Sequence, residues 1–515
     1  MFIQLLRVVW SILLLCAALG LCAQGFNKRY DAFGQGYAQG AYGLERSSSG
    51  HVIFSFSYEP DTIGPDSVVG GYIIILHGLD EGGNLQWQKR YRRPLHGVYL
   101  GWADCCDTVP GGGYVVGGSS EQYWTGVGEA RVVRFNAQGD SLWSRSFGSP
   151  GHYWIGQQVK HLDDGGFVIC GGTDATGYQD GFLIRMDAEG NELWRQTYGW
   201  PDPVYIDGLT SVEESADGDL FMSGSRFLGL EEGQHWVQRT SPDGLVRWQV
   251  DWGGPYKEGA TYLSLLSDDF PLVAGASGYA TEYAQMRPYL AKIDTLDGSR
   301  FWEHEYGEAF FSTGFFAAKE CPNTDIIACG VTYEGGNEQG LLLRATGDGD
   351  SLWMRNYSYY DEVIDSCRGR FWDVLTTQDG GFIMSGFANG PFNGPYPPGY
   401  SQDAWVVKVD SMGCVVPGCD GVGVTEIITN MQGALTVFPS PAHGQVQVQI
   451  DLPITMRNKQ DLQLSLMNAT GQLVAQQAAF EGNNTISLST IAAGLYHVHL
   501  TNGRTWLAGT KLVVE

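Results

Sequence analysis

The residues of this chain that could carry out acid–base chemistry are aspartates scattered through a sequence rich in glycine and aromatic residues. The candidates near aromatic segments are Asp104, Asp107, Asp207, Asp365 and Asp373. Hydrolysis of a glycosidic bond needs two carboxyl groups roughly 5 to 10 Å apart, and the sequence does not set that distance. An extracellular carbohydrate-active enzyme, a glycan hydrolase or lyase, is therefore one hypothesis for this chain.

Other catalytic and metal-binding patterns are absent from the sequence or incomplete. It contains no Gly-x-Ser-x-Gly, His-Glu-x-x-His, phosphate-loop or Cys-x-x-Cys motif. His497 and His499 lie two positions apart without a third ligand nearby, and we interpret them as solvent-facing residues of a strand. We therefore select no catalytic residue, cofactor or metal site, and a non-catalytic binding protein is the leading hypothesis.

Aromatic residues recur in short segments between predicted strands, and they are the candidate ligand-binding residues. Exposed rings at such positions can stack on sugars or anchor a partner protein, whereas buried ones would pack between neighbouring repeats. The residues that we select are Trp102, Trp154, Phe315, Trp372 and Tyr396. Tyr396 belongs to a Gly- and Pro-rich insertion at 389–399, and long insertions on a rigid scaffold often bind ligands.

A tryptophan repeat indicates the framework that positions these side chains. Six tryptophans recur at intervals of about 51 to 56 residues, and each is followed four positions later by a second aromatic residue. The pairs are Trp87/Tyr91, Trp143/Phe147, Trp194/Tyr198, Trp248/Trp252, Trp302/Tyr306 and Trp353/Tyr357. Residues four apart in a strand lie on the same face, so each repeat contains a strand with an aromatic face.

A hairpin signal precedes these tryptophans. Glycine stands four residues earlier at Gly139, Gly190, Gly244, Gly298 and Gly349. Glycine with short polar neighbours is typical of tight turns. Apolar strands come before the turn, for example at 166–172 and 182–186. With a further strand after each tryptophan pair, each repeat has four antiparallel strands, the composition of a propeller blade.

The two ends of the repeat array predict a closed ring. The last repeat reaches Pro417 where a tryptophan is expected, while Phe26-Asn-Lys-Arg-Tyr30 has the aromatic pair without a blade before it. The N-terminal strand can therefore complete the last blade and leave no open edge. Inner strands start near Gly50, Gly113, Gly166, Asp219, Phe270, Asp325 and Gly381. We expect residues 24–419 to form an all-β, seven-bladed β-propeller, rather than one with eight blades.

The N-terminal segment and the composition predict an exported protein. Arg7, the apolar run from Val8 to Leu21 and the small residue Ala23 are typical of a signal peptide at 1–23, and no later stretch is apolar enough for a transmembrane segment. The formal net charge of −26, without a basic stripe, argues against a nucleic-acid partner. The expected location is extracellular or on the outer cell surface.

The cysteines fit an oxidising compartment. Cys414 and Cys419 are close enough in sequence for a loop disulfide, which we predict. Cys170 and Cys329 occupy the same position of two repeats and are predicted to be buried thiols. The pairing of the remaining cysteines stays open; these are Cys105, Cys106, Cys321 and Cys367.

A change in composition after Cys419 predicts a linker at 420–433 and a second domain at 434–515. Alternating apolar residues predict strands at 435–438, 445–450, 462–467, 472–479, 485–488, 495–500 and 505–514. Short strands of this kind, separated by turn residues, favour a small immunoglobulin-like β-sandwich.

The residues of this second domain carry a family resemblance. The segments that carry it are Val437-Phe-Pro-Ser-Pro-Ala442, Leu466-Met-Asn-Ala-Thr-Gly471, Ala493-Gly-Leu-Tyr-His-Val498 and Gly509-Thr-Lys-Leu-Val-Val514. In this order they resemble the motifs of the type A C-terminal sorting domain of the type IX secretion system, although Ser440 and Asn468 replace the usual Asn and Asp. The resemblance implies a Bacteroidetes-type bacterium, the type IX machinery as partner, and a sorting signal that includes Gly494, Tyr496 and Lys511.

The repeat has a resemblance of its own. Its Asp-x-x-Gly-x-x-x-Trp turn is similar to the tryptophan-docking motif of quinoprotein propellers, which we interpret as shared blade packing without a bound quinone. The sequence thus predicts a secreted or cell-surface β-propeller that binds a glycan or a surface protein. It does not determine which ligand is bound, whether the protein is released or anchored, or its oligomeric state.

Overall fold

The computed structural model of the chain describes residues 25–31, 39–64, 67–122, 127–200, 205–228, 232–254, 256, 258, 261–280, 285–334, 337–359, 368–389, 402–419, 427–431, 433–452, 461–502 and 505–515. Its described elements are all strands, and within these ranges no helix is long and apolar enough to cross a membrane. They divide into two compact units. The larger comprises 28–375 and 384–406, and the smaller comprises 376–383, 407–515 and the described residues before Lys28.

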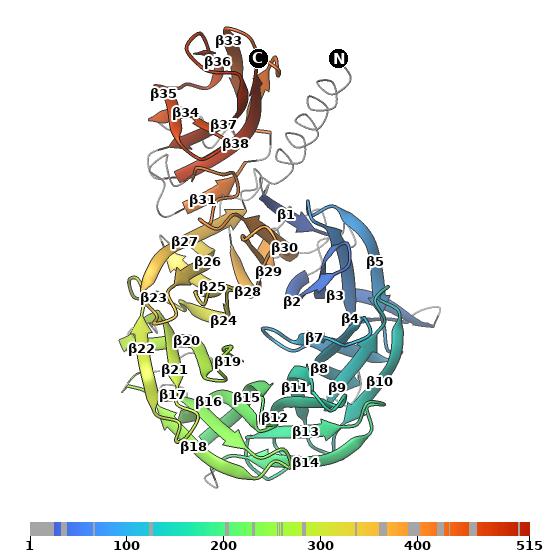
Figure 1. The fold of residues 1–515 in the computed structure, drawn as a ribbon. Helices are drawn as coiled ribbons and strands as arrows, with labels where there is room; N and C mark the ends of the chain where they lie inside the picture. The colour runs from blue at the N-terminus through green and yellow to red at the C-terminus, as the bar shows by residue number, and fades with distance from the viewer. Residues whose placement is uncertain are drawn as a thin grey trace, which may run out of the picture. The chain divides into compact units, whose positions relative to one another are not determined.

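Four-stranded antiparallel sheets recur along the larger unit (Figure 1). The first holds β2 (Gln39–Ser47), β3 (Gly50–Gly64), β4 (Ser67–Asp80) and β5 (Leu85–Tyr91). In the second, β6 (His96–Leu100) and β7 (Cys106–Thr108) both pair with β8 (Tyr114–Gln122), followed by β9 (Gly128–Phe135) and β10 (Ser141–Phe147). The third holds β11 (Trp154–His161), β12 (Phe167–Thr173), β13 (Asp180–Met186) and β14 (Glu192–Tyr198).

The same pattern continues to the end of this unit. The fourth sheet holds β15 (Tyr205–Glu214), β16 (Leu220–Leu228), β17 (Glu232–Thr240) and β18 (Val246–Trp252). The fifth holds β19 (Tyr262–Leu265), β20 (Pro271–Ala280), β21 (Gln285–Ile293) and β22 (Arg300–Glu305), and the short β23 (Phe310–Phe311) pairs with β21. The sixth holds β24 (Gly314–Glu320), β25 (Ile326–Glu334), β26 (Asn337–Ala345) and β27 (Ser351–Tyr359). A further sheet has the order β28 (Gly369–Thr376), β29 (Phe382–Asn389), β30 (Gln402–Val409) and β1 (Phe26–Tyr30).

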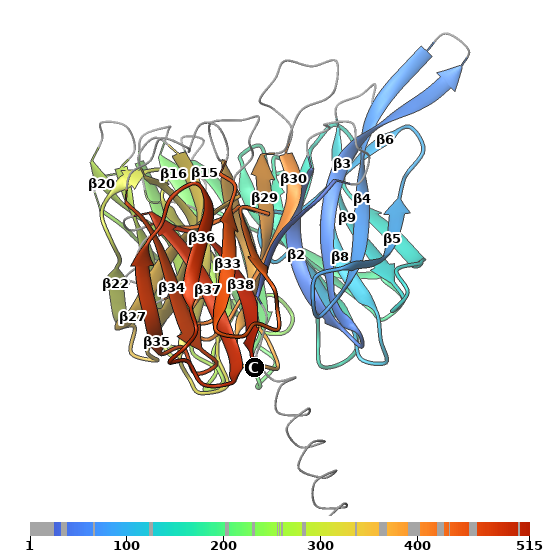
Figure 2. The same cartoon turned by 90° about the horizontal axis from the view of Figure 1, so that it is seen from above.

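The sheets of the larger unit follow one another in a circle, with the first strand of each nearest the centre (Figure 1). In the view of Figure 2, β3 and β4 extend as a long hairpin beyond the neighbouring strands. Apolar side chains fill the space between successive sheets: Val132 and Phe147 pack with Phe167 and Ile184 of the next sheet, for example. The core is therefore repeated between the sheets, as expected for a β-propeller.

Five of the six repeat tryptophans, from Trp87 to Trp302, pack on a glycine of the following sheet. A Cβ atom added to Gly139 would lie 2.7 Å from the Trp87 ring, and one added to Gly244 would lie 2.9 Å from the Trp194 ring. Both glycines have positive φ, 79° and 82°, as the predicted turns require. The spacing of glycine and tryptophan in the sequence therefore has a physical cause, since the indole needs a turn without a side chain on the adjacent sheet.

The smaller unit contains two sheets after the circle of strands. One has the order β31 (Ile427–Asn430), β38 (Thr505–Val514), β37 (Gly494–Asn502), β34 (Leu462–Asn468) and β35 (Leu473–Ala478). The other has β32 (Leu435–Phe438), β33 (Gln445–Ile450) and β36 (Gly482–Ser487). Alternate residues of β33 are buried, namely Val446, Val448 and Ile450, as expected for a strand with one face on a core.

The structure bears out the coarse predictions and differs in detail. The all-β fold and the recurring four-stranded antiparallel sheets agree with the predicted propeller. The predicted strands of the C-terminal domain match β32 to β38 to within a few residues. The predicted linker contains β31, which pairs in parallel with β38. The immunoglobulin-like topology remains a prediction, and the predicted signal peptide lies outside the described residues.

Candidate functional site

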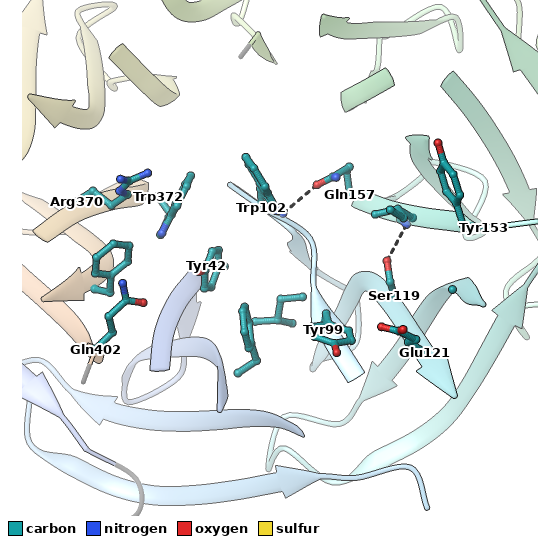
Figure 3. A pocket seen from close by; sticks show the side chains of 16 residues that line it. Tyr42, Tyr99, Trp102, Ser119, Glu121, Tyr153, Gln157, Arg370, Trp372 and Gln402 are labelled. Carbon is teal, nitrogen blue, oxygen red and sulfur yellow. Dashed lines mark hydrogen bonds between the residues drawn. The ribbon is translucent and has the colours of Figure 1, made fainter. Parts of the chain in front are cut away.

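A pocket with aromatic walls lies where the first strands of several sheets begin (Figure 3). We call it the Trp102 pocket, and its volume is about 730 Å³. The rings that line it are Tyr42, Phe56, Tyr99, Trp102, Tyr153, Trp372 and Phe387, and the polar side chains are Ser119, Glu121, Gln157, Arg370 and Gln402. Aromatic rings and hydrogen-bonding groups thus line one concave surface, which is typical of small-ligand sites.

Trp102 is the exposed ring of this pocket. It lies between β6 and β7, and 56% of its surface is accessible. Its backbone N–H donates a hydrogen bond to Gln157 Oε1 at 3.1 Å. A Cβ atom on Gly101 would lie only 1.6 Å from the backbone oxygen of Gln157, so glycine is required where these two sheets approach. The segment is therefore held by its backbone while the indole ring faces outward.

Trp372 is the centre of an aromatic stack in the wall of the Trp102 pocket. Its ring stacks on Phe316 at 4.5 Å and on Tyr42 at 5.2 Å between ring centroids. The guanidinium of Arg370 lies 5.4 Å from the Trp372 centroid, within the range of a cation–π contact. Only 5% of Trp372 is exposed, and its Nε1 has no hydrogen-bond partner among the described residues. Trp372 thus supports the wall of the pocket without offering an open ring face, and its Nε1 atom is itself buried.

Two smaller pockets adjoin the Trp102 pocket and share its central ring. One, of about 470 Å³, is lined by Trp102, Tyr153, Asp207 and Tyr262 among others. The other, of about 280 Å³, is lined by Trp102, Arg370 and Trp372 among others. Trp102 therefore borders all three pockets, which meet around its ring.

Charged side chains of four first strands and of the segment between β6 and β7 form a buried network. Lys319 Nζ lies 2.8 Å from Asp373 Oδ1 and 3.2 Å from Asp104 Oδ1. Lys160 Nζ lies 2.9 Å from both Asp104 Oδ2 and Glu213 Oε1. Five residues from five sheets are thereby joined, which ties the centres of these sheets together.

The pKa values in this network follow from burial and from the two lysines. Burial raises the pKa of Glu213 to about 7 and that of Asp373 to about 6. Burial alone would also raise the pKa of Asp104, but Lys160 and Lys319 hold it below its usual value. Burial thus raises the pKa of two carboxyl groups of the network, while the two lysines form ion pairs with Asp104, Asp373 and Glu213.

The predicted acid–base candidates make different kinds of contact in the structure. Asp104 and Asp373 both bind Lys319, and Asp107 accepts the backbone N–H of His161 at 2.9 Å. Asp207 accepts the backbone N–H of Trp200 at 3.0 Å and lines the pocket of about 470 Å³. Asp365 lies outside the described residues.

The candidate ligand-binding rings also fall into separate groups. Trp102 and Trp372 line the Trp102 pocket, whereas Trp154 is 3% exposed and packs on Phe182, and Phe315 is fully buried beside Tyr306. The last two belong to the core between sheets, because their side chains point between the sheets rather than into a pocket. Tyr396 lies outside the described residues.

Sequence reasoning missed several residues of the Trp102 pocket, chiefly Tyr42, Arg370 and Gln402. Arg370 could have been found, because it stands two positions before Trp372 in one strand and so shares its face. Tyr42 and Gln402 come from strands far apart in sequence, and no local signal links them to Trp102.

The cysteines are mostly buried thiols. Cys414 and Cys419, the pair predicted to be bonded, form a disulfide in the structure with Cα atoms 5.5 Å apart. Cys170 and Cys329 are free and fully buried, as predicted. Cys105, Cys106 and Cys321 are also free and buried, while Cys367 lies outside the described residues.

The interpretation of His497 and His499 as solvent-facing is wrong. They are 1% and 0% exposed, because β37 lies inside its sheet and other segments cover both rings. His499 donates from Nε2 to the Pro417 carbonyl at 3.0 Å and accepts the Trp506 indole N–H at 2.9 Å. Burial lowers the pKa of each to about 4, so both rings are neutral at physiological pH.

The residues assigned to the sorting signal lie on two adjacent strands. Gly494 begins β37, and the Tyr496 hydroxyl donates to the Ala492 carbonyl at 2.7 Å. Lys511 of β38 is the register partner of His497. Gly494 and Tyr496 of β37 and Lys511 of β38 therefore lie near the same end of this pair of strands, in the larger sheet of the smaller unit.

Comparison with known proteins gives one family match and several distant structures. No curated protein sequence matches the chain. A crystal structure of a Dyadobacter fermentans protein of unknown function has a TM-score of 0.38 at 10% identity, covering 75% of this chain and 98% of that one. The periplasmic gluconolactonase of Pseudomonas aeruginosa has a TM-score of 0.38 at 13% identity, covering 73% and 97%. A Bacteroides caccae protein of unknown function has a TM-score of 0.36 at 13% identity, covering 55% and 89%.

The family match falls on the segment whose motifs carried the resemblance in the sequence. It covers the strands β32 to β38 of the smaller unit together with Gly494, Tyr496 and Lys511. By this match, residues 436–515 are a secretion system C-terminal sorting domain, of the type IX system.

Proposed function

We propose that this protein is a secreted or cell-surface binding protein without catalytic activity. It consists of a seven-bladed β-propeller at 24–419, a linker at 420–433 and a sorting domain at 434–515. The sorting domain implies export to the surface through the type IX machinery, and a signal peptide at 1–23 provides the first step. The sheet order that places β1 beside β30 supports closure of the ring by the N-terminal strand.

The proposed ligand is a glycan bound in the Trp102 pocket. The observation that carries this proposal is the exposed indole of Trp102 at the junction of three pockets. The main volume of about 730 Å³ lies within the range of roughly 300 to 1,000 Å³ that is usual for small-ligand sites. A surface protein would instead need a contact area of about 800 Å² on this face. The Gln157, Glu121 and Gln402 side chains supply polar groups beside the rings, as a sugar requires.

A glycan array with the full-length mature protein tests this proposal. Replacing Trp102 by alanine removes the exposed ring, and loss of such an anchor typically costs about 2 kcal/mol or more of binding free energy. Phe301→Ala is the matched control, because Phe301 is 65% exposed and lies on β22 away from the Trp102 pocket. Normal glycan binding by Trp102→Ala, or capture of a surface protein and of no glycan, would contradict the proposed ligand.

A carbohydrate-active enzyme is the second candidate, and one pair of carboxylates favours it. Asp207 and Asp180 are 3% and 7% exposed, and each has an Oδ1 atom without a hydrogen-bond partner among the described residues. Both approach Gly199, where a Cβ atom would lie 2.0 Å from Asp180 Oδ1 and 3.1 Å from Asp207 Oδ2. Burial raises the pKa of both, that of Asp207 to about 6. Such a group can retain its proton and act as a general acid.

Turnover assays on a panel of polysaccharides separate the two candidates. An enzyme should release product in the parent and lose that activity in Asp207→Asn, which preserves the acceptor for Trp200. If the parent binds a glycan but cleaves none of the panel, the binding function stands alone.

A further inference from the structure

A second cleft of about 830 Å³ lies between the fourth and fifth sheets, and it shares no residue with the Trp102 pocket. We call it the His235 cleft. Among the residues that line it are His235, Trp252, Glu258, Tyr289, Arg300 and Glu303. Its chemistry is independent of the function proposed above.

At the His235 cleft a histidine occupies a position that holds glycine or an apolar residue in the first, second, third and sixth sheets. In the second, third and sixth sheets a small residue stands opposite the second aromatic residue of the repeat: Ala130 faces Phe147, Gly181 faces Tyr198 and Gly340 faces Tyr357. In the first sheet the apolar Ile74 faces Tyr91. In the fourth sheet His235 faces Trp252 instead. His235 and Trp252 both carry ring nitrogen atoms, whereas the matching pairs of those other sheets join glycine or an apolar residue to phenylalanine or tyrosine. The packing that those sheets share therefore does not explain the histidine.

The hydrogen bonds of the second aromatic residue change in the same place. In the third and fifth sheets the tyrosine hydroxyl closes the gap to the next sheet, since Tyr198 donates to the Gly244 carbonyl and Tyr306 to the Gly349 carbonyl. Trp252 Nε1 instead donates to the Tyr289 hydroxyl at 3.0 Å, and Tyr289 donates to Glu303 Oε2 at 2.6 Å. The link between these two sheets thus runs through side chains that border the cleft.

His235 and Glu258 leave two buried groups unsatisfied. His235 is 1% exposed, stacks on Tyr289 at 5.0 Å, and contacts Thr261 Oγ1 through Nδ1 at 2.7 Å. Its Nε2 lies 3.6 Å from Glu258 Oε2 and has no hydrogen-bond partner among the described residues. Burial, followed by the nearby charge of Arg300, lowers the pKa of His235 to about 3, so the ring is neutral at physiological pH. With the proton on Nδ1 toward Thr261, Nε2 presents a lone pair to the carboxylate, and both acceptors lack a donor; with the proton on Nε2, its N–H faces Glu258 Oε2 at 3.6 Å, beyond hydrogen-bond distance.

Glu258 has no cationic side chain beside it among the described residues, and burial raises the pKa of its carboxyl group. Its carboxylate, 3% exposed, accepts the backbone N–H groups of Gly254 at 2.7 Å and Gly278 at 2.9 Å. Within the described residues no lysine or arginine forms an ion pair with it. A buried carboxylate without a cation is costly, and two of its lone-pair sites remain open.

The other acidic residues of the cleft already have cationic partners. Asp251 lies 2.6 Å from Arg226, Glu303 lies 2.9 Å from Arg300, and Glu305 lies 3.4 Å from Arg287. Among the described acidic side chains that line the cleft, the unmet demand for positive charge is therefore centred on Glu258 and the adjacent His235 Nε2.

We propose that the His235 cleft binds a ligand through a primary ammonium group, which donates to the Glu258 carboxylate and, from the same side, to His235 Nε2 in the tautomer that carries its proton on Nδ1. An ammonium has three donors and one positive charge, so it satisfies both acceptors and pairs with the carboxylate. A guanidinium is planar and less suited to two acceptors on different sheets at this separation. The ammonium can belong to an aminoalkyl chain or to an amino sugar, and both fit the volume of the cleft.

Calorimetric titration of the full-length mature protein tests this site. The probes are cadaverine and glucosamine, each with neutral counterparts, 1,5-pentanediol for the first and glucose and N-acetylglucosamine for the second. At least one amine should bind and all neutral compounds should fail. Cadaverine alone would indicate an aminoalkyl ligand, and glucosamine alone an amino sugar. Failure of both amines, or equal binding of their neutral counterparts, would overturn the proposal.

Matched variants locate the binding. Glu258→Gln should weaken the amine by roughly tenfold or more, since it removes a buried charge partner. Glu59→Gln removes one charge of an ion pair elsewhere on the first sheet and should have no effect. If Glu258→Gln does not fold, His235→Phe retains the ring stack on Tyr289 and removes only the Nε2 acceptor. Amine binding unchanged in both cleft variants would refute the site. Trp102→Ala should bind the amine normally, so the outcome does not depend on the glycan proposal.

Discussion

The ring of Trp143 covers Gly190 of the following sheet, where a Cβ atom would lie 2.8 Å from the indole. Gly190 has a φ of 78°, so it is both the turn residue of its own hairpin and the docking point for the preceding sheet. The same contact recurs from sheet to sheet, for example between Trp248 and Gly298 at 2.8 Å. The stability of the circle of sheets should therefore depend on these small contacts.

Substitution of Gly190 measures the docking contact. Gly190→Ala and Gly165→Ala both place a side chain at positive φ, 78° and 89°, which costs about 1 to 3 kcal/mol in each case. A Cβ atom at Gly165 meets nothing within 4 Å, whereas at Gly190 it meets Trp143. Gly190→Ala should thus lower the free energy of unfolding by a further 1 to 3 kcal/mol, roughly the cost of overpacking. Denaturant unfolding of both variants checks this, and equal losses would show that the docking contact contributes little.

Deletion of Phe26 to Tyr30 tests closure of the ring. The deletion removes β1, exposes the edge of β30 and removes the bond from the Tyr30 hydroxyl to the Gly83 carbonyl at 2.7 Å. An exposed edge strand favours aggregation, so the truncated protein should aggregate or melt well below the parent. Tyr30→Phe, which removes only the hydroxyl, should cost about 0.5 to 1.5 kcal/mol. A truncation that melts like the parent, measured by calorimetry and light scattering, would show that β1 is dispensable.

Asp207 should make stability fall as the pH rises. Burial raises its pKa to about 6 in the folded protein, against an ordinary value of about 3.9 in an unfolded chain. Between these values the folded state binds the proton that the unfolded state has released, so the stability that this group contributes at low pH is lost as the pH rises through about 6. Asp207→Asn should therefore flatten the melting temperature across this range relative to the parent.

Asp140 supplies the opposite case as a control for that experiment. It is exposed, and hydrogen bonds from Lys89 and Asn136 hold its pKa below the usual value. The stability that Asp140 contributes is present at pH values above the ordinary pKa of aspartate and is lost as the pH falls further. Asp140→Asn should therefore leave unchanged the shape of the curve of melting temperature against pH between about pH 4 and 6. The same pH profile in Asp207→Asn and the parent would contradict the assignment to Asp207.

The sorting domain should be necessary and sufficient for the last step of export. Removing residues 434–515 should leave the protein in the periplasm, because the machinery no longer recognises it. Conversely, attaching 434–515 to a fluorescent protein that bears a signal peptide should bring that protein to the cell surface or the medium. Cell fractionation in a host with a type IX system measures both. Normal amounts of the truncated protein outside the cell would refute the role of this segment.

The sequence alone determined the features that depend on neighbours in the chain. The spacing of Gly190 and Trp194 within one hairpin, and the alternation of Val446, Val448 and Ile450 in β33, are local patterns, because a strand exposes alternate faces and a turn needs glycine. The order of motifs at 436–515 likewise identified the sorting domain without a structure.

Only the tertiary structure decided which side chains meet. Trp102 and Trp154 are both tryptophans in segments that link successive repeats, yet Trp102 is exposed and Trp154 is buried. The packing of adjacent sheets covers the ring of Trp154 and does not cover that of Trp102. His235 and Glu258 come from different elements, and their approach to 3.6 Å depends on how the fourth sheet meets the segment that follows it. Contacts between distant residues depend on how whole sheets pack against each other, and the local alternation of residues carries no record of that packing.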